Sequence, residues 1–178
     1  KHSTLTIPSL DVVYSPKIRD RATRYLELSD GCFTDHSLVT REEQRVMGLF
    51  SARMRLNGHD HYSIPPEYGG PNGLIGWVHT FYQINGLLPV AQYFERHPEW
   101  YSLIDGKRQR ERSQLCLTND GMRKEMVRVV KERIRENPGA TMISISQNDW
   151  RGYCECEKCK ALDLQEGAEL GGILQAPG

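Results

Sequence analysis

Three of the five cysteines stand within six residues of one another, in the run Cys154-Glu155-Cys156-Glu157-Lys158-Cys159. Cysteine thiolates are preferred zinc ligands, and three at this spacing can occupy three corners of a tetrahedral site. The same residues could instead form a local disulfide, as expected in an exported protein, or remain free thiols. The acidic neighbours Glu155 and Glu157 disfavour the thiolate on which a cysteine nucleophile depends.

A fourth sulfur ligand must come from elsewhere in the chain, and Cys116 is the candidate. It lies in Gln114–Thr118, a predicted short strand, whereas the cysteine run follows the β-branched stretch Thr141–Ser146. A helix predicted over Met122–Arg135 joins these two strands into a βαβ unit with adjacent parallel strands. Because the strand ends would approach each other, Cys116 could complete a closed structural site with the three clustered cysteines. Structural zinc, a disulfide and free thiols are all open on this reasoning.

Polar residues follow the apolar stretches, and ligands in parallel α/β folds bind where strands end. Asp149 comes directly after one such stretch and is the candidate general acid, beside the indole of Trp150. A partly dry pocket against an indole favours a protonated carboxyl group, and the ring offers a stacking face for a sugar. The structural alternative is that Asp149 caps a turn and that Trp150 packs on the rim.

Three further residues are candidates for binding substrate: His79, Asn148 and Asn119. His79 lies near the end of the predicted strand Leu74–Phe81. A histidine at a strand end can bind a carboxylate or hydroxyl group, or be a core residue bonded to backbone.

A second candidate metal site is weaker, because it rests on only two histidines. His59 and His61 flank Asp60, so a strand would place both imidazoles on one face. They could hold a metal there, or be solvated loop residues.

The composition excludes several classes of protein. Lys plus Arg and Asp plus Glu each number 23 in the 178 residues, so the basic excess of a dedicated nucleic-acid binder is missing. With 38% hydrophobic and 26% charged residues, the chain is not expected to be disordered. No apolar run approaches the roughly 20 residues of a spanning helix, so membrane insertion is not expected.

The element pattern predicts an α/β fold. A helix is predicted over Arg41–Met54, with Thr40 and Glu43 as a capping box, and another over Lys158–Gln165. About four βα units fit the length, whereas a complete eight-stranded barrel needs about 250 residues. We therefore expect a partial TIM barrel over residues 39–174, after an irregular segment at 1–38 and before a tail at 175–178.

Several spaced motifs resemble a bacterial family that carries a domain of unknown function. The resemblance covers Arg41–Leu174, and its motifs occur in order. The motifs are Arg53-x-Arg55-Leu56-Asn57, Gly76-x-x-His79-Thr80-Phe81, Phe94–Leu103, Asp105–Arg108, Gln114–Asn119, Ser144–Asp149 and Cys154-x-Cys156-x-x-Cys159. Through this family the chain is similar to glycoside hydrolases of the α-glucuronidase and hexosaminidase types, which are (β/α) barrels.

The resemblance implies a periplasmic or extracellular enzyme acting on a polysaccharide or oligosaccharide that could contain uronate, with no catalytic cofactor. Asp149 would be the acid, while His79, Asn148 and Asn119 would hold the substrate and Trp150 would stack on a ring. The second carboxylate would lie in the remainder of a longer chain, with Glu67 and Asp60 as local substitutes. The alternatives are a non-catalytic carbohydrate-binding domain and a zinc-stabilised structural domain.

Overall fold

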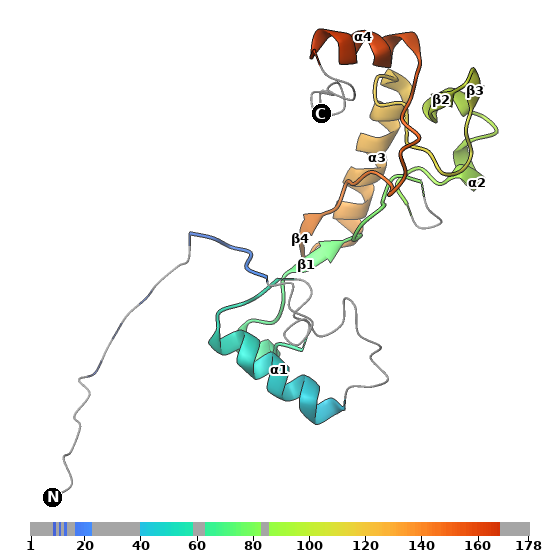
Figure 1. The fold of residues 1–178 in the computed structure, drawn as a ribbon. Coiled ribbons are helices and arrows are strands. Elements are labelled where there is room, and N and C mark those ends of the chain that lie inside the picture. The colour runs from blue at the N-terminus through green and yellow to red at the C-terminus, as the bar shows by residue number, and fades with distance from the viewer. Residues whose placement is uncertain are drawn as a thin grey trace, which may run out of the picture. The chain divides into compact units, whose positions relative to one another are not determined.

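The computed structural model describes residues 9, 11, 13, 17–22, 40–58, 63–82 and 86–167 (Figure 1). The chain divides into two compact units, Lys1–Pro71 and Asn72–Gly178, and each is described by itself. The predictions on His59, Asp60 and His61 and on the tail at 175–178 lie outside the described residues, as does most of segment 1–38.

The first unit contains helix α1, Arg41–Arg53, followed by the short 3-10 helix η2, Pro66–Tyr68. The capping box is confirmed, because the Thr40 hydroxyl accepts from the Glu43 amide at 3.2 Å and the Glu43 carboxylate accepts from the Thr40 amide at 2.8 Å. Inside α1, Gly48 allows close packing: a Cβ there would lie 1.9 Å from the Ser63 carbonyl oxygen. The helix therefore starts where local chemistry predicts and packs where it lacks a side chain.

The second unit contains two small sheets. Strands β1, Gly73–Ile75, and β4, Ala140–Ile143, pair in parallel, with Leu74 opposite Met142. Strands β2, Leu103–Ile104, and β3, Lys107–Arg108, form an antiparallel hairpin.

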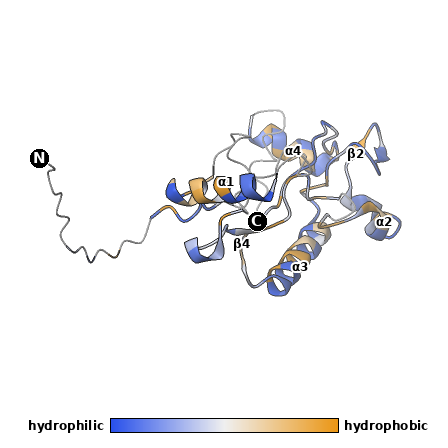
Figure 2. Cartoon of the chain, turned by 90° about the horizontal axis from the view of Figure 1, so that it is seen from below, coloured by the Kyte–Doolittle hydropathy of each residue, from blue (hydrophilic) through white to orange (hydrophobic). Residues whose placement is uncertain are grey.

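Along the chain, the helices of the second unit come between and after these strands. Helix α2, Val90–Tyr93, and the 3-10 helix η3, Pro98–Trp100, precede the hairpin, and α4, Glu157–Gln165, follows β4. The longest helix is α3, Asp120–Glu136, which confirms the helix predicted from periodicity. Charged residues dominate its surface, with hydrophobic residues at intervals along it (Figure 2).

Two predicted strands are wrong in extent. The strand expected over Leu74–Phe81 ends at Ile75, because Gly76 and His79 both have positive φ angles, 71° and 57°, and so turn the chain. Over Gln114–Thr118, Leu115 makes an isolated bridge to Tyr101, and Ser113, just before this stretch, bridges to Gly152. The expected βαβ unit is therefore wrong as well, since β4 pairs with β1 instead.

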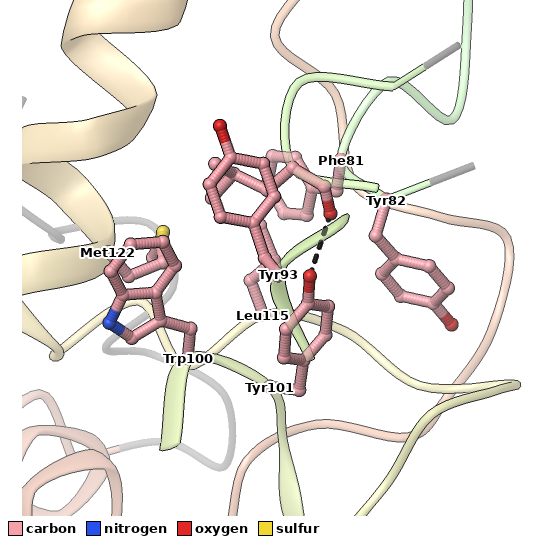
Figure 3. Close-up of a cluster of buried hydrophobic side chains, with 8 residues drawn as sticks. Phe81, Tyr82, Tyr93, Trp100, Tyr101, Leu115 and Met122 are labelled. Atoms are coloured by element: carbon pink, nitrogen blue, oxygen red, sulfur yellow. Dashed lines mark hydrogen bonds between the residues drawn. The ribbon is translucent and has the colours of Figure 1, made fainter. Parts of the chain in front are cut away.

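A cluster of aromatic side chains forms the core of the second unit (Figure 3). Tyr101 is fully buried, and its hydroxyl donates to the Leu88 carbonyl at 2.9 Å. The ring of Tyr101 lies edge-on to that of Tyr82, with centroids 6.0 Å apart. This cluster also includes Trp100 and Leu115, which flank the segment leading to Cys116.

The mixed α/β content with a small parallel sheet agrees with the predicted fold class. Across the described residues the strands form no closed barrel, so a partial TIM barrel stays a prediction. No helix in the described part of the chain has both the length and the apolar character to cross a membrane.

Candidate metal centre

Cys116 is brought to the site by the aromatic core. Its amide donates to the Trp100 carbonyl at 2.8 Å, and its neighbour Leu115 bridges to Tyr101. The chain then turns, because the Asn119 amide donates to the Cys116 carbonyl at 3.0 Å. The side chain of Cys116 is consequently buried, with 3% exposed.

The other three cysteines arrive on the segment that follows β4. Gly152 allows this segment to approach the chain before Cys116, since a Cβ there would lie 2.6 Å from the Arg112 carbonyl oxygen. Cys154 comes two residues later, beside the β2–β3 hairpin, where the Glu155 amide donates to the Leu103 carbonyl at 2.7 Å. Cys156 is the N-cap residue of α4, and Cys159 lies in its first turn.

The four sulfur atoms of Cys116, Cys154, Cys156 and Cys159 lie within 4.8 Å of one another. The Cys116 sulfur is 3.7 Å from that of Cys156 and 3.9 Å from that of Cys159. Four sulfurs each about 2.3 Å from a central zinc are about 3.8 Å apart, whereas disulfide sulfurs are about 2.05 Å apart. The four cysteines are unpaired, and their spacing has the dimensions of a tetrahedral metal site.

Several groups near the sulfurs can stabilise negative charge there. The Leu103 amide donates to the Cys154 sulfur at 3.4 Å, and the Thr118 hydroxyl lies 3.2 Å from the Cys159 sulfur. Cys156 and Cys159 sit at the N-terminus of α4, whose dipole stabilises negative charge.

The thiols of Cys116, Cys154 and Cys159 also affect one another. Hydrogen bonds from Cys154 and then Cys159 lower the pKa of the Cys116 thiol. The same contacts raise the pKa of Cys159 and of Cys154, which donate to that first thiolate. Negative charge on Cys116 therefore disfavours a second thiolate at Cys154 or Cys159.

A closed set of four sulfurs has no position left for a substrate, which is typical of structural zinc. The cavity beside Cys154 and Cys159 has a volume of about 30 Å³, room for about one water molecule. The arrangement can hold an ion and tie chain segments together.

The predicted substrate residues Asn148, Asp149 and Trp150 follow β4 in a turn, and the side chain of Gln114 holds the backbone of this turn. The Gln114 amide nitrogen donates to the carbonyls of Asn148 and Trp150, each at 2.6 Å, and its oxygen accepts from the Asn148 amide at 2.9 Å. Asn148 is buried, and its side-chain oxygen has no hydrogen-bond partner. Asp149 is exposed at the top of this turn.

Trp150 is 46% exposed, and the Arg112 guanidinium lies 5.8 Å from its ring centroid. Arg112 itself has a φ of 51°, a strained conformation for this residue type. Trp150 thus presents an exposed indole beside a cation.

The remaining predicted residues are placed differently. His79 is half-buried in a turn, and its Nδ1 is buried without a hydrogen-bond partner. The Asn119 side chain caps α3, since its oxygen accepts from the Met122 amide at 3.0 Å. Substrate binding by either residue stays a prediction.

Sequence reasoning missed two residues that support these sites. Gln114, with 3% exposed, holds the turn at Asn148, and Arg108 of β3 approaches the Cys154 sulfur. Both residues belong to motifs of the family resemblance, Gln114–Asn119 and Asp105–Arg108, but these motifs assign neither residue a role.

Comparisons with known proteins place the chain in a family. No curated protein and no solved structure matches the chain. One family, described as a domain of unknown function (DUF4838), matches residues 1–176, nearly the whole sequence. The chain therefore belongs to the DUF4838 family.

Proposed function

We propose that Cys116, Cys154, Cys156 and Cys159 bind one zinc ion and that this ion has a structural role. The observation that carries the proposal is the sulfur spacing of 3.7 and 3.9 Å, against about 3.8 Å expected around tetrahedral zinc. Soft thiolate ligands also favour zinc over calcium, magnesium or manganese.

Such an ion would stabilise the second unit by joining segments that are distant in sequence. One is the segment at Cys116, which leads into α3, and the other is the segment at Cys154, which leads into α4. The strand content is small, so few backbone ladders tie these segments together. Zinc binding would supply part of the folding free energy, as it does in small metal-dependent domains.

The test is the zinc content of the purified chain, measured by native mass spectrometry and elemental analysis. We expect about one zinc per chain, displaced by Co²⁺ with the appearance of sulfur-to-metal charge-transfer absorption. Cys116→Ser should lose the ion, whereas Cys32→Ser, which alters the fifth cysteine, serves as the matched control. A chain that carries no metal, or that keeps zinc in Cys116→Ser, would contradict the proposal.

We propose further that the edge formed by the carboxyl ends of β1 and β4 binds carbohydrate. The two segments that follow these strands lie side by side: the Thr80 hydroxyl donates to the Ser144 carbonyl at 3.1 Å and accepts from the Ser146 amide at 2.8 Å. Ligand sites in parallel α/β folds occupy this edge. Trp150 would stack on a sugar ring and Asp149 would act as acid or would stabilise an oxocarbenium ion.

An open hollow lies along the segment that follows Trp150, and it is lined by neither Asp149 nor Trp150. Its volume is about 450 Å³, within the usual range for small-molecule sites. It is lined by Ile104, Arg151, Tyr153, Glu155, Lys160 and Asp163, among others. These charged and aromatic side chains suit a polar ring, including a uronate.

The carbohydrate proposal is tested by calorimetry and hydrolysis assays on neutral and uronate-containing oligosaccharides. Asp149→Asn should abolish hydrolysis without unfolding the chain, whereas Asp105→Asn, at an exposed hairpin turn, should not. Unchanged turnover in Asp149→Asn would exclude the acid role. Binding without hydrolysis by the wild type would favour the non-catalytic carbohydrate-binding domain.

A further inference from the structure

Arg108 is a half-buried cation whose closest partners are a carbonyl and a sulfur. Its Nη1 donates to the Tyr101 carbonyl at 2.8 Å and to the Cys154 sulfur at 3.8 Å. Among the described residues, no carboxylate lies within ion-pair distance of it. Its neighbour Arg110 differs, because it pairs with the Glu95 carboxylate at 2.7 Å.

A guanidinium that is partly removed from water is stabilised by a nearby negative charge. A neutral thiol is a weak hydrogen-bond acceptor and carries no negative charge. A thiolate is a strong acceptor and carries the negative charge. Four thiolates around one divalent ion leave a net charge of about −2 on the centre. The position of Arg108 is therefore explained when Cys154 is a metal-bound thiolate.

The β2–β3 hairpin places the positive charge of Arg108 beside the Cys154 sulfur. Leu103 and Arg108 are directly opposite in its register, so both reach the same sulfur. The Leu103 amide contributes a second donor, at 3.4 Å from the Cys154 sulfur. The Asp105 amide also donates to the Glu155 carboxylate at 3.3 Å, which ties the hairpin tip to the cysteine segment.

We propose that Arg108 is the positioning residue of the metal centre: its charge stabilises the Cys154 thiolate and so raises the affinity of the four cysteines for zinc. The inference rests on the proposed zinc site. It assigns to the hairpin a role in retaining the metal, beyond its contacts with the backbone.

Three variants separate charge from packing. Arg108→Gln keeps an amide donor for the Tyr101 carbonyl but removes the positive charge, and Arg108→Lys keeps the charge. Arg110→Ala removes a cation two residues away that touches no sulfur, and it is the matched control. Far-ultraviolet circular dichroism establishes that each variant is folded in saturating zinc.

Zinc affinity is measured by competition with a chromophoric chelator, and zinc release is followed as the pH is lowered. Loss of a group that supports a metal ligand typically costs 10- to 100-fold in affinity. We expect Arg108→Gln to lose about this much and to release zinc at a higher pH, because its thiolate is protonated more readily. Arg108→Lys should restore most of the affinity, and Arg110→Ala should match the wild type.

The outcomes distinguish the two proposals. A wild-type chain that binds zinc, with Arg108→Gln unchanged in affinity and release pH, would overturn the role of Arg108 and leave the zinc site standing. Equal losses in Arg108→Gln and Arg108→Lys would also overturn it, since charge would then not matter. A wild-type chain that binds no zinc would contradict the proposed metal site itself.

Discussion

The cysteine cluster and the turn at Asn148–Trp150 lie on the same stretch of chain yet differ in almost every physical respect. The cluster is closed, with its sulfurs turned toward one another and Cys116 buried. The turn is open, because Asp149 and Trp150 are exposed. The side chain of Gln114 hydrogen-bonds to the backbone of the turn. The cluster is suited to stabilising the fold, and the turn is suited to presenting side chains to a ligand.

The same two chain segments hold both regions, so a change in one segment can affect both. Gln114 holds the turn, and Cys116, two residues later, belongs to the cluster. On the other segment, Gly152 separates Trp150 from Cys154 and lies against Arg112 and Ser113. Four changes test how far the two regions depend on each other.

Removal of zinc by a strong chelator should have the largest effect and should act first on the cluster. Zinc at 1,000 times its Kd stabilises a folded chain by about 4 kcal/mol relative to the metal-free form. We therefore expect a marked fall in Tm by differential scanning calorimetry, reversed by added zinc. An unchanged Tm would remove the structural role of the cluster.

Gly152→Ala should disturb both regions together. Its new Cβ would lie 2.6 Å from the Arg112 carbonyl oxygen and 2.7 Å from the Ser113 Cα, both backbone atoms that cannot swing away. We expect a loss of about 1–3 kcal/mol in the free energy of unfolding, measured with urea on the zinc-loaded chain. Gly139→Ala, where a Cβ meets nothing within 4 Å, is the control and should be nearly neutral. Equal stability of the two variants would show that the segments are not held at Gly152.

Gln114→Ala should weaken the turn and leave the cluster bound to zinc. It removes three hydrogen bonds and leaves buried backbone groups of Asn148 and Trp150 without partners, so a loss of about 2 kcal/mol is expected. Urea unfolding gives the loss, and chelator competition gives the zinc affinity. Gln147→Ala, at an exposed position in the same turn, is the control. A large fall in zinc affinity would show that the two regions are one unit.

Trp150→Ala should have the smallest effect on stability and the most selective effect on ligand binding. The ring is 46% exposed, so its loss should change the free energy of unfolding by about 0.5 kcal/mol or less. Zinc affinity should stay at the wild-type value while carbohydrate binding, measured by calorimetry, disappears. A strongly destabilised variant would instead make Trp150 a packing residue, the structural alternative for this position.

The sequence predicted the helices well because their signals are local. The capping box at Thr40 and the apolar spacing in α3 involve residues within one or two turns of each other. The cysteine run is local in the same sense, since α4 carries two of its members at one end. Cys116 was also identified correctly as the fourth member, although through a strand pairing that the structure does not contain.

The strands could not be predicted as well, because their extent depends on distant partners. An apolar stretch at Leu74–Phe81 reads as one long strand, but pairing with β4 covers only its first residues, and a turn begins at Gly76. Gln114–Thr118 has strand-like residues, yet Leu115 makes an isolated bridge with Tyr101 and the Gln114 amide donates to the Gly152 carbonyl. Backbone pairing depends on which segments meet in the folded chain, and the residue pattern of one segment does not show which partner it will have.

The helices and the cysteine run follow from signals that are local in the sequence. Helix caps, apolar spacing and the choice of cysteine are set by neighbours along the chain. The tertiary structure alone decided that four sulfurs meet at metal-site distances, that Gln114 holds the Asn148 turn, and that Arg108 faces a sulfur. The physical reason is that these contacts join segments dozens of residues apart, which only packing of the core brings together.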